Sequence, residues 1–471
     1  MYEKPRKMSK QMDIMEGSES ESSIFRVNNN LCEFSPCGDF FAIAYQSNLI
    51  IKRSGIFDTT NSYELDDVIE YIEWSPNSQY ILCANIKKCV IRVFSIFYPE
   101  WKCKFVEGSA GMEKVMWSPD GNHIISFAEL KIQISIWSLE NQSITNIQNL
   151  KSLTDTNVLF SPNGKNLAVI TTDNGTDSIE IYKTKGWKIS RKLLCEKLSA
   201  IDGLCWSPNS ELLCMWCSIS GQTKLLVYST TTESHVGVFC PEVSKTKIDG
   251  AIRDNYQGPR GIDRVSWNPS GQLLAIAAFN ETIVLLNYVT WKPILDLRCN
   301  PVITECDYLG RIYRELEKRD SNVNLAQGET HKMEEVMERP INIPIGTNFK
   351  GSGDGPFIAR IDIFEFSCCG RYLAFRHQVY SSTLWIWDIA EDSVDYVMLK
   401  RPISGICWSP NSPRLMIFNE SPQFFEWSAS RKATGHSSPR GITVLSGRWH
   451  PRGKMLSLGG YNKTAIMRFT E

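Results

Sequence analysis

The chain has 471 residues, of which 42% are hydrophobic, and its 51 Lys and Arg residues nearly balance 52 Asp and Glu, for a formal net charge of −1. A charge this close to zero gives no long-range attraction to nucleic acid or to an anionic membrane surface. No apolar run approaches the roughly 18 residues of a membrane-spanning helix. The chain exceeds the length of an ordinary single domain, so several domains or a repeat must organise it.

The N-terminal stretch is polar. Residues 1–23 are rich in charged residues and Ser, as in Glu16-Gly17-Ser18-Glu19-Ser20-Glu21, and hold little that a core could bury. We expect a disordered tail over 1–23, and not a secretory signal, which needs an apolar segment. A short strand candidate, Ile24–Val27, follows the tail.

A five-residue signature recurs along the rest of the chain. Its clearest copy is Trp117-Ser118-Pro119-Asp120-Gly121. Proline cannot donate to a sheet ladder and Asp-Gly tolerates the positive φ of a tight turn, while the alternating residues on both sides predict strands. Further copies begin at Phe34, Trp74, Phe160, Trp206, Trp267, Phe366, Trp408 and Trp449.

The spacing of the signature indicates the fold. Successive aromatic residues lie 40, 43, 43, 46, 61, 99, 42 and 41 residues apart. A period of about 40–45 residues that contains several short strands is typical of a blade of a WD-repeat β-propeller. We therefore predict an all-β chain in which residues 24–471 form a single closed ring of about nine four-stranded blades.

The blades depart from the regular WD repeat in their polar residues. Only Trp387-Asp388 keeps the Trp-Asp dipeptide, and the usual Gly-His dipeptide survives at most once, at Gly435-His436. The buried Asp–His network of regular blades is therefore expected to be mostly missing. Apolar packing is expected to hold the ring.

The two ends of the repeat complement each other. Two strand candidates, Met455–Leu458 and Thr464–Phe469, follow the last turn, which leaves the last blade one strand short. Ile24–Val27 is one strand too many before the first turn. We predict that Ile24–Val27 completes the last blade, because this pairing closes the ring and removes an open sheet edge.

Two intervals exceed the period and predict insertions at about 241–259 and 299–356. The second contains Tyr308–Arg319, which suits a helix or an outer strand, and a Gly-rich stretch, Lys350–Gly355. Long irregular segments in a compact fold are often functional. A functional insertion, an insertion without a role and a degenerate extra blade all remain open.

Catalytic and metal-binding motifs are missing from the sequence. It has no phosphate loop, no H-E-x-x-H and no G-x-S-x-G, and only six His. Cys214-Met215-Trp216-Cys217 has a metal-ligand spacing, but on a predicted strand its two thiols point to opposite faces. The 15 Cys suit small buried hydrophobes in a reducing compartment. We predict no catalytic residue, no cofactor and no metal site.

One segment resembles a known family. It is Pro99-Glu100-Trp101-Lys102-Cys103-Lys104-Phe105-Val106-Glu107-Gly108-Ser109-Ala110-Gly111. It is similar to a segment of a family of WD-repeat proteins found at centrosomes and spindle poles. The resemblance runs from about Ile24 to the last blade. Supporting stretches are Tyr71–Ser75, Val289–Lys292 and Trp385–Ile389.

The resemblance implies a non-enzymatic cytoplasmic scaffold at the centrosome, basal body or spindle pole, part of the cytoskeleton. Family members bind a coiled-coil microtubule-anchoring protein and help anchor microtubule minus ends, and in fungi a minus-end-directed kinesin joins the complex. No nucleic-acid or membrane partner is expected. Trp101, Lys104 and Glu107 are the candidate partner-binding residues. Alternatively, the segment is a tight inter-blade connection in which Trp101 is a core residue.

Two other function classes stay open. Propellers of translation initiation factors also carry repeated Trp-Ser-Pro turns and can reach nine blades, and they would associate with the ribosome or RNA. Against this class, the net charge is −1 and no dense Lys/Arg stripe with interleaved aromatic residues is visible. An enzyme would need carboxylates with perturbed pKa values that converge in the central funnel.

Overall fold

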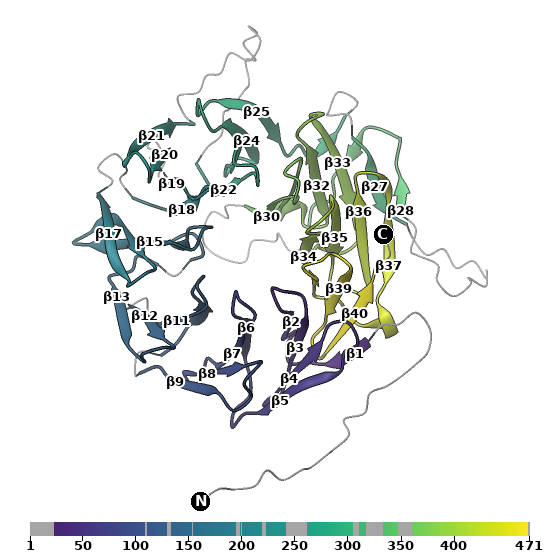
Figure 1. Cartoon of the computed structure of the whole chain (residues 1–471). Helices are drawn as coiled ribbons and strands as arrows, with labels where there is room; N and C mark the ends of the chain where they lie inside the picture. The colour runs from purple at the N-terminus through teal and green to yellow at the C-terminus, as the bar shows by residue number, and fades with distance from the viewer. Residues whose placement is uncertain are drawn as a thin grey trace, which may run out of the picture.

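The computed structural model describes residues 23–108, 111–129, 133–152, 154–194, 198, 200–218, 223–241, 261–304, 310–316, 333–346 and 360–469. Nine β-sheets stand radially around one axis and form a closed ring, which confirms the predicted WD-repeat β-propeller (Figure 1). The expected tail, apart from Ser23, and nearly all of the expected insertion at 241–259 lie outside the described residues.

Blades 1–3 each have four antiparallel strands, which follow one another from the axis outward. Blade 1 consists of β2 (Cys32–Phe34), β3 (Phe40–Tyr45), β4 (Asn48–Arg53) and β5 (Thr59–Glu64). Blade 2 consists of β6 (Tyr71–Trp74), β7 (Tyr80–Asn85), β8 (Val90–Ser95) and β9 (Lys102–Val106). Blade 3 consists of β10 (Lys114–Trp117), β11 (His123–Phe127), β12 (Gln133–Ser138) and β13 (Ile144–Gln148).

Blades 4–6 repeat this arrangement. Blade 4 consists of β14 (Val158–Phe160), β15 (Asn166–Asp173), β16 (Thr176–Lys183) and β17 (Lys188–Leu194). Blade 5 consists of β18 (Gly203–Trp206), β19 (Leu212–Cys217), β20 (Lys224–Ser229) and β21 (Ser234–Phe239). Blade 6 consists of β22 (Arg264–Trp267), β23 (Leu273–Ala277), β24 (Thr282–Asn287) and β25 (Pro293–Arg298).

Blades 7–9 complete the ring and include the irregular sheets. Blade 7 has β30 (Ile361–Phe366), β31 (Tyr372–His377), β32 (Thr383–Asp388) and β33 (Ser393–Met398) as its regular strands. Blade 8 consists of β34 (Gly405–Trp408), β35 (Arg414–Phe418), β36 (Gln423–Ser428) and β37 (Arg431–Ser437). Blade 9 takes β38 (Ser446–Trp449), β39 (Met455–Gly459) and β40 (Lys463–Arg468) from one end of the chain and β1 (Ser23–Arg26) from the other.

The strand β1 closes the ring as predicted. It pairs antiparallel with β40, with Ser23 opposite Ile466 and Arg26 opposite Lys463. The strand begins at Ser23, one residue inside the stretch expected to be tail. Because β1 covers the outer edge of β40, this edge is hydrogen-bonded to the chain's own N-terminal segment.

The second insertion widens blade 7 instead of forming another blade. Within the expected Tyr308–Arg319 segment, β27 (Ile312–Glu315) pairs parallel with β33, and β28 (Met333–Glu335) pairs with β27. The outer-strand interpretation is therefore confirmed, and the expectation of four strands is wrong for blade 7, which has six. The other described strands of the insertion, β26 (Val302–Ile303) and β29 (Ile341–Asn342), pair only with each other.

Each signature forms the turn between the first and second strands of its blade. In blade 3 the hydroxyl of Ser118 accepts a hydrogen bond from the backbone N–H of His123 at 3.0 Å, and Gly121 has φ +69°. A side chain is strained at this φ, so glycine suits the position. Ser78 stands there in blade 2 with φ +58°, and its hydroxyl accepts a bond from Cys37 N–H of blade 1 at 3.0 Å.

The signature tryptophans also tie neighbouring blades together. The indole N–H of Trp117 donates to the backbone oxygen of Glu73, the residue before Trp74, at 3.1 Å. The same type of bond recurs at other seams, where the signature Trp of one blade donates to a backbone oxygen of the preceding blade. These bonds run from Trp74 to Glu33, Trp206 to Leu159, Trp408 to Glu365 and Trp449 to Cys407. The ring is therefore held by these indole bonds as well as by the expected apolar packing.

Candidate binding sites on blades 2 and 7

The segment Pro99–Gly111 is mainly the outer strand of blade 2. It contains the end of the turn after β8, the whole of β9 and the start of the connection to blade 3. The alternative interpretation as a tight inter-blade connection is therefore wrong for most of its length. Ser109 and Ala110 lie outside the described residues.

Trp101 lies at the boundary between core and surface. It is partly buried, and its ring lies 5.0 Å from that of Tyr80, which in turn stacks on Trp117 at 6.2 Å. The neighbouring Phe97 and Tyr98 are 61% and 74% exposed. Two large exposed rings on one turn are unusual for a surface without a partner.

The other two candidate residues differ in exposure. Lys104 is exposed on β9. Glu107 is buried, and its carboxylate accepts hydrogen bonds from the hydroxyls of Ser126 and Ser135 of blade 3. Contrary to expectation, Glu107 is not part of the exposed surface. Its partners lie 19 and 28 residues away, so no local pattern revealed this inward position.

A second candidate site is a cavity of about 440 Å³ between blades 7 and 8. Three arginines line it. Arg311 and Arg339 come from the insertion and Arg371 from the first turn of blade 7. The lining also includes Asp388, Asp395, Tyr372 and Trp427. None of these residues was predicted as a site from the sequence.

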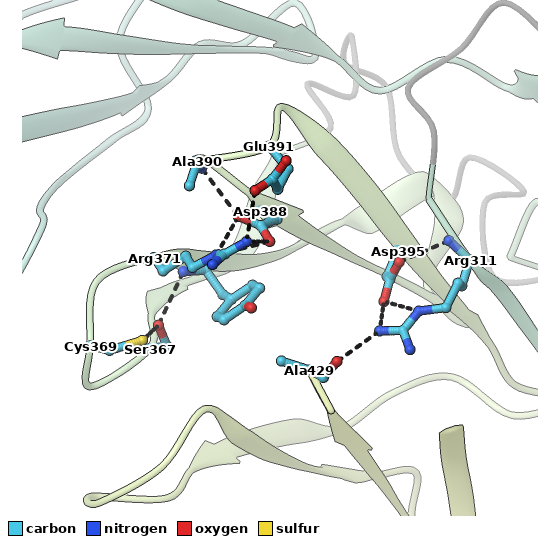
Figure 2. A network of polar contacts seen from close by, with 10 residues as sticks. Arg311, Ser367, Cys369, Arg371, Asp388, Ala390, Glu391, Asp395 and Ala429 are labelled. Atoms are coloured by element: carbon cyan, nitrogen blue, oxygen red, sulfur yellow. Dashed lines mark hydrogen bonds and ion pairs between the residues drawn. The ribbon is translucent and has the colours of Figure 1, made fainter. Parts of the chain in front are cut away.

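Asp395 anchors the insertion to both blades. Its carboxylate accepts bonds from Arg311 N, Nε and Nη2 at 2.8, 3.2 and 2.9 Å, and from Trp427 Nε1 of blade 8 at 2.9 Å (Figure 2). Burial alone lowers the pKa of Arg311, but the hydrogen bond and charge of Asp395 outweigh burial and raise this pKa. Figure 2 also shows Arg311 reaching the backbone oxygen of Ala429, 3.4 Å away.

Asp388 holds the second arginine. Its carboxylate accepts bonds from Arg371 Nε at 2.8 Å and Nη2 at 2.7 Å, and from Ala390 N at 3.1 Å (Figure 2). The hydrogen bond and charge of Asp388 raise the pKa of Arg371. Tyr372 packs edge-on against Trp427 with ring centroids 5.2 Å apart, which connects the two blades beside these ion pairs.

Arg339 has a different role. Its Nη2 donates to the backbone oxygen of Gly310 at 2.8 Å, and within the described ranges it forms no ion pair. Gly310 itself packs against β33, where an added Cβ would lie 1.6 Å from the oxygen of Val394. Only glycine fits this approach, so the position of the insertion against blade 7 is fixed by backbone contact.

Carboxylates with raised pKa values do occur on the innermost strands. Burial, and next the charge of Glu33, raise the pKa of Glu73 to about 7. However, Glu73 accepts bonds from Tyr71 Oη and Trp117 N, both at 3.2 Å, and Glu33 pairs with Arg448 at 3.2 Å. Both carboxylates thus have structural partners, with Glu73 satisfying the backbone N–H of Trp117 on the innermost strand of the next blade.

Metal-ligating side chains do not cluster in the part of the chain that the structure describes. It contains no group of three or more His, Cys, Asp or Glu side chains that could hold a metal ion. Over the same ranges, no helix is long and apolar enough to cross a membrane. Cys214 and Cys217 are both buried on β19.

Comparisons with known proteins give two sequence similarities. The mouse (Mus musculus) WD repeat-containing protein WRAP73 is 28% identical to this chain over 457 residues, which cover 93% of each protein. A family model described as eukaryotic translation initiation factor eIF2A matches residues 42–201, about a third of the chain.

Two solved structures have a similarity to the chain that extends over most of its length. The C-terminal WD40 domain of Sif2 has a TM-score of 0.48 and 10% identity, covering 97% of this chain and all of that one. A chain of the mitotic checkpoint complex has a TM-score of 0.40 and 14% identity, covering 78% of this chain and 96% of that one.

Proposed function

We propose, from its similarity to WRAP73, that this WD-repeat β-propeller is a non-enzymatic scaffold of the microtubule-organising centre. In this role it resides in the cytoplasm at the centrosome, basal body or spindle pole. It binds a coiled-coil anchoring protein and helps to hold microtubule minus ends there. A minus-end-directed kinesin is a second partner of such a complex.

The observation that carries the proposal is the Pro99–Gly111 segment, which resembles the centrosomal and spindle-pole family. The similarity to WRAP73 along 93% of both proteins supports it, because it extends over the ring and not over a single blade. Propellers present a broad surface built from many loops, which suits protein recognition.

The edge of blade 2 supplies a surface of the right chemistry. Phe97 and Tyr98 are exposed aromatic residues, and Lys102 and Lys104 are exposed on the adjoining β9. Aromatic side chains are frequent anchors in interfaces, and a helical partner offers apolar residues at every third or fourth position, flanked by charges. We propose that Trp101 supports this surface from below and that Lys104 pairs with an acidic residue of the partner.

The test is localisation of the tagged protein in cells of its own species through the cell cycle. We expect it at spindle poles or basal bodies, with a coiled-coil protein recovered by affinity purification. The variant Tyr98→Ser/Lys104→Glu should lose both the pole signal and the coiled-coil partner. Tyr461→Ser is the matched control, since Tyr461 is 57% exposed on blade 9. A diffuse wild-type protein at every stage would refute the proposal.

A second candidate function is association with the ribosome during translation initiation. The eIF2A family match favours it, because residues 42–201 span most of blades 1–4. The net charge of −1 provides little attraction to RNA. Sucrose-gradient sedimentation distinguishes the two functions. Co-migration with small ribosomal subunits at physiological salt would favour this second function over the first.

A further inference from the structure

We propose that the cavity between blades 7 and 8 binds an acidic side chain of an extended segment of a partner protein, held by Arg339 and Arg371. This binding site goes beyond the proposed cellular role and does not depend on it. Scaffolds of either function could use it, and binding of a peptide to the purified protein is independent of localisation in the cell.

The carboxylates of the cavity are already occupied. Asp395 accepts four hydrogen bonds, three from Arg311 and one from Trp427. Asp388 accepts bonds from Arg371 and from Ala390 N. An ionised carboxylate has about four lone-pair sites. The two acids therefore serve to position arginines and offer little to a basic ligand.

Among the described residues, in contrast, some guanidinium N–H groups have no acceptor. Arginine carries about five N–H groups. Arg339 donates to the oxygen of Gly310, and Arg371 directs Nε and Nη2 at Asp388, with Glu391 Oε1 also 3.5 Å from Nη2. The cavity lining holds three arginines and two aspartates, a formal charge of +1. A site with free donors, occupied acceptors and a positive charge matches an anionic group with several acceptor atoms.

The donors are also pre-organised. Arg371 is held by the carboxylate of Asp388, and Arg339 donates to the oxygen of Gly310, which itself packs on the backbone of Val394. Tyr372 and Trp427 form an aromatic contact between the blades. Ligand binding then costs little side-chain ordering, because most of these side chains are already held.

Size and charge indicate a protein segment instead of a nucleic acid. The volume of about 440 Å³ exceeds that of one carboxylate and admits a whole side chain with part of its backbone. A single-stranded nucleic acid is instead bound by a basic groove that follows several phosphates, with aromatic stacking platforms. The cavity has one net positive charge and lies between two blades, so an acidic peptide is the better match.

The experiment measures fluorescence anisotropy of a fluorescein-labelled hexaglutamate peptide with the full-length protein. We expect saturable binding that Arg339→Gln weakens at least about tenfold, since the variant loses charge-assisted hydrogen bonds to the ligand. The matched control is Arg314→Gln, which removes an equal charge from β27 of the same insertion but outside the cavity. Its affinity should stay within about twofold of wild type. Equal losses in the two variants would overturn the proposal.

A second measurement needs no substitution and remains informative if a variant folds poorly. Hydrogen–deuterium exchange of the wild-type protein should show protection of residues 310–316 and 388–395 with hexaglutamate and none with hexaglutamine. Binding of the same peptide with phosphoserine at its centre identifies the preferred acid, and equal or tighter binding supports the site. Absence of protection, or stronger binding of a uridine hexamer at the same residues, would overturn it.

Discussion

The seam between blades 9 and 1 differs from the seam between blades 2 and 3 in its polar contacts. Between blades 2 and 3, Trp117 donates its indole N–H to Glu73 O at 3.1 Å. At the other seam the corresponding residue of blade 1 is Phe34, which has no donor. Instead, His450 Nε2 donates to Gly38 O at 2.7 Å, in the opposite direction across the seam.

Further polar groups are concentrated at the closing seam. Asn30 donates to the hydroxyl of Ser446 at 2.5 Å, Arg452 pairs with Asp39 at 2.7 Å, and Arg448 pairs with Glu33 at 3.2 Å. These contacts join residues more than 400 positions apart, for example 416 for Asn30 and Ser446. Blades 2 and 3 are consecutive in the chain, and the polar contacts between them join residues 19 to 44 positions apart. Blades 9 and 1 come from opposite ends of the chain, and directional polar contacts specify their pairing.

The largest expected effect comes from removing the closing strand. Deletion of residues 1–28 removes β1 and exposes the edge of β40, so we expect loss of the cooperative thermal transition. Deletion of residues 1–18 keeps β1 and should melt like the full chain. Circular dichroism melts of the two truncations provide the measurement. Equal melts would show that the seam does not depend on β1.

The next effect tests the indole bonds between consecutive blades. Trp206→Phe leaves the oxygen of Leu159 without its donor, 3.2 Å away in the native protein, and should destabilise the fold by roughly 1–3 kcal/mol in urea denaturation. Trp187→Phe is the matched control, because the buried indole N–H of Trp187 has no acceptor among the described residues. If Trp187→Phe lowers the free energy of unfolding as much as Trp206→Phe does, the destabilisation reflects the smaller ring volume and not the lost hydrogen bond.

A smaller effect concerns how the stability of the seam between blades 9 and 1 depends on pH. Burial lowers the pKa of His450 below 6.5, and its Nδ1 accepts the N–H of Arg452 at 3.0 Å. Because the pKa of His450 is lower in the folded than in the unfolded state, the contribution of His450 to the stability of the fold is complete above pH 6.5. This stabilisation is lost as the pH falls below 6.5. Wild type should lose more stability than His450→Gln between pH 7.5 and 5.5.

The comparison with His450→Gln is needed because other groups titrate over the same range. Glutamine keeps one donor and one acceptor but has no proton to gain. Glu73, whose pKa is raised to about 7, acts in the opposite direction, since the protein gains stability as this carboxylate binds a proton below pH 7. Both proteins contain Glu73, so it cancels in the difference. Identical pH profiles would exclude a role for His450.

The smallest effect concerns the exposed ion pair of the closing seam. The side chains of Arg452 and Asp39 are 62% and 57% exposed, so solvent screens their attraction. A double-mutant cycle with Arg452→Gln and Asp39→Asn should give a coupling energy below about 1 kcal/mol that decreases in high salt. A larger coupling that persists in high salt would place this pair among the main stabilising contacts of the seam.

The ring and its closure could be predicted because their signals are local and repeated. Most of the turns combine a Ser hydroxyl, a Pro and a residue that accepts positive φ within five positions, as in Trp117–Gly121. The surplus strand at Ile24–Val27 and the missing strand of the last blade indicated the closure. The six strands of blade 7 were not predicted, since β27 pairs with β33 from a different part of the chain.

The sites were harder to predict because their partners are distant in sequence. Arg311 and Asp395 lie 84 residues apart, and Arg311 comes from an insertion without a repeat pattern. Glu107 looked like a surface residue of a charged segment, yet it points to Ser126 and Ser135 of the next blade. Phe97 and Tyr98 precede the strand within the segment that carries the resemblance, and their exposure follows from the fold of the turn, not from their residue type.

The six-stranded blade 7 has a consequence for stoichiometry. Eight blades share one four-stranded plan, so a partner that recognises only that plan would meet up to eight similar positions and could bind in several rotational settings. In the described part of the chain, added strands (β27 and β28) occur on blade 7 alone. A partner that contacts blade 7 and its insertion therefore binds once per ring and in one orientation, which makes a pseudosymmetric molecule monovalent.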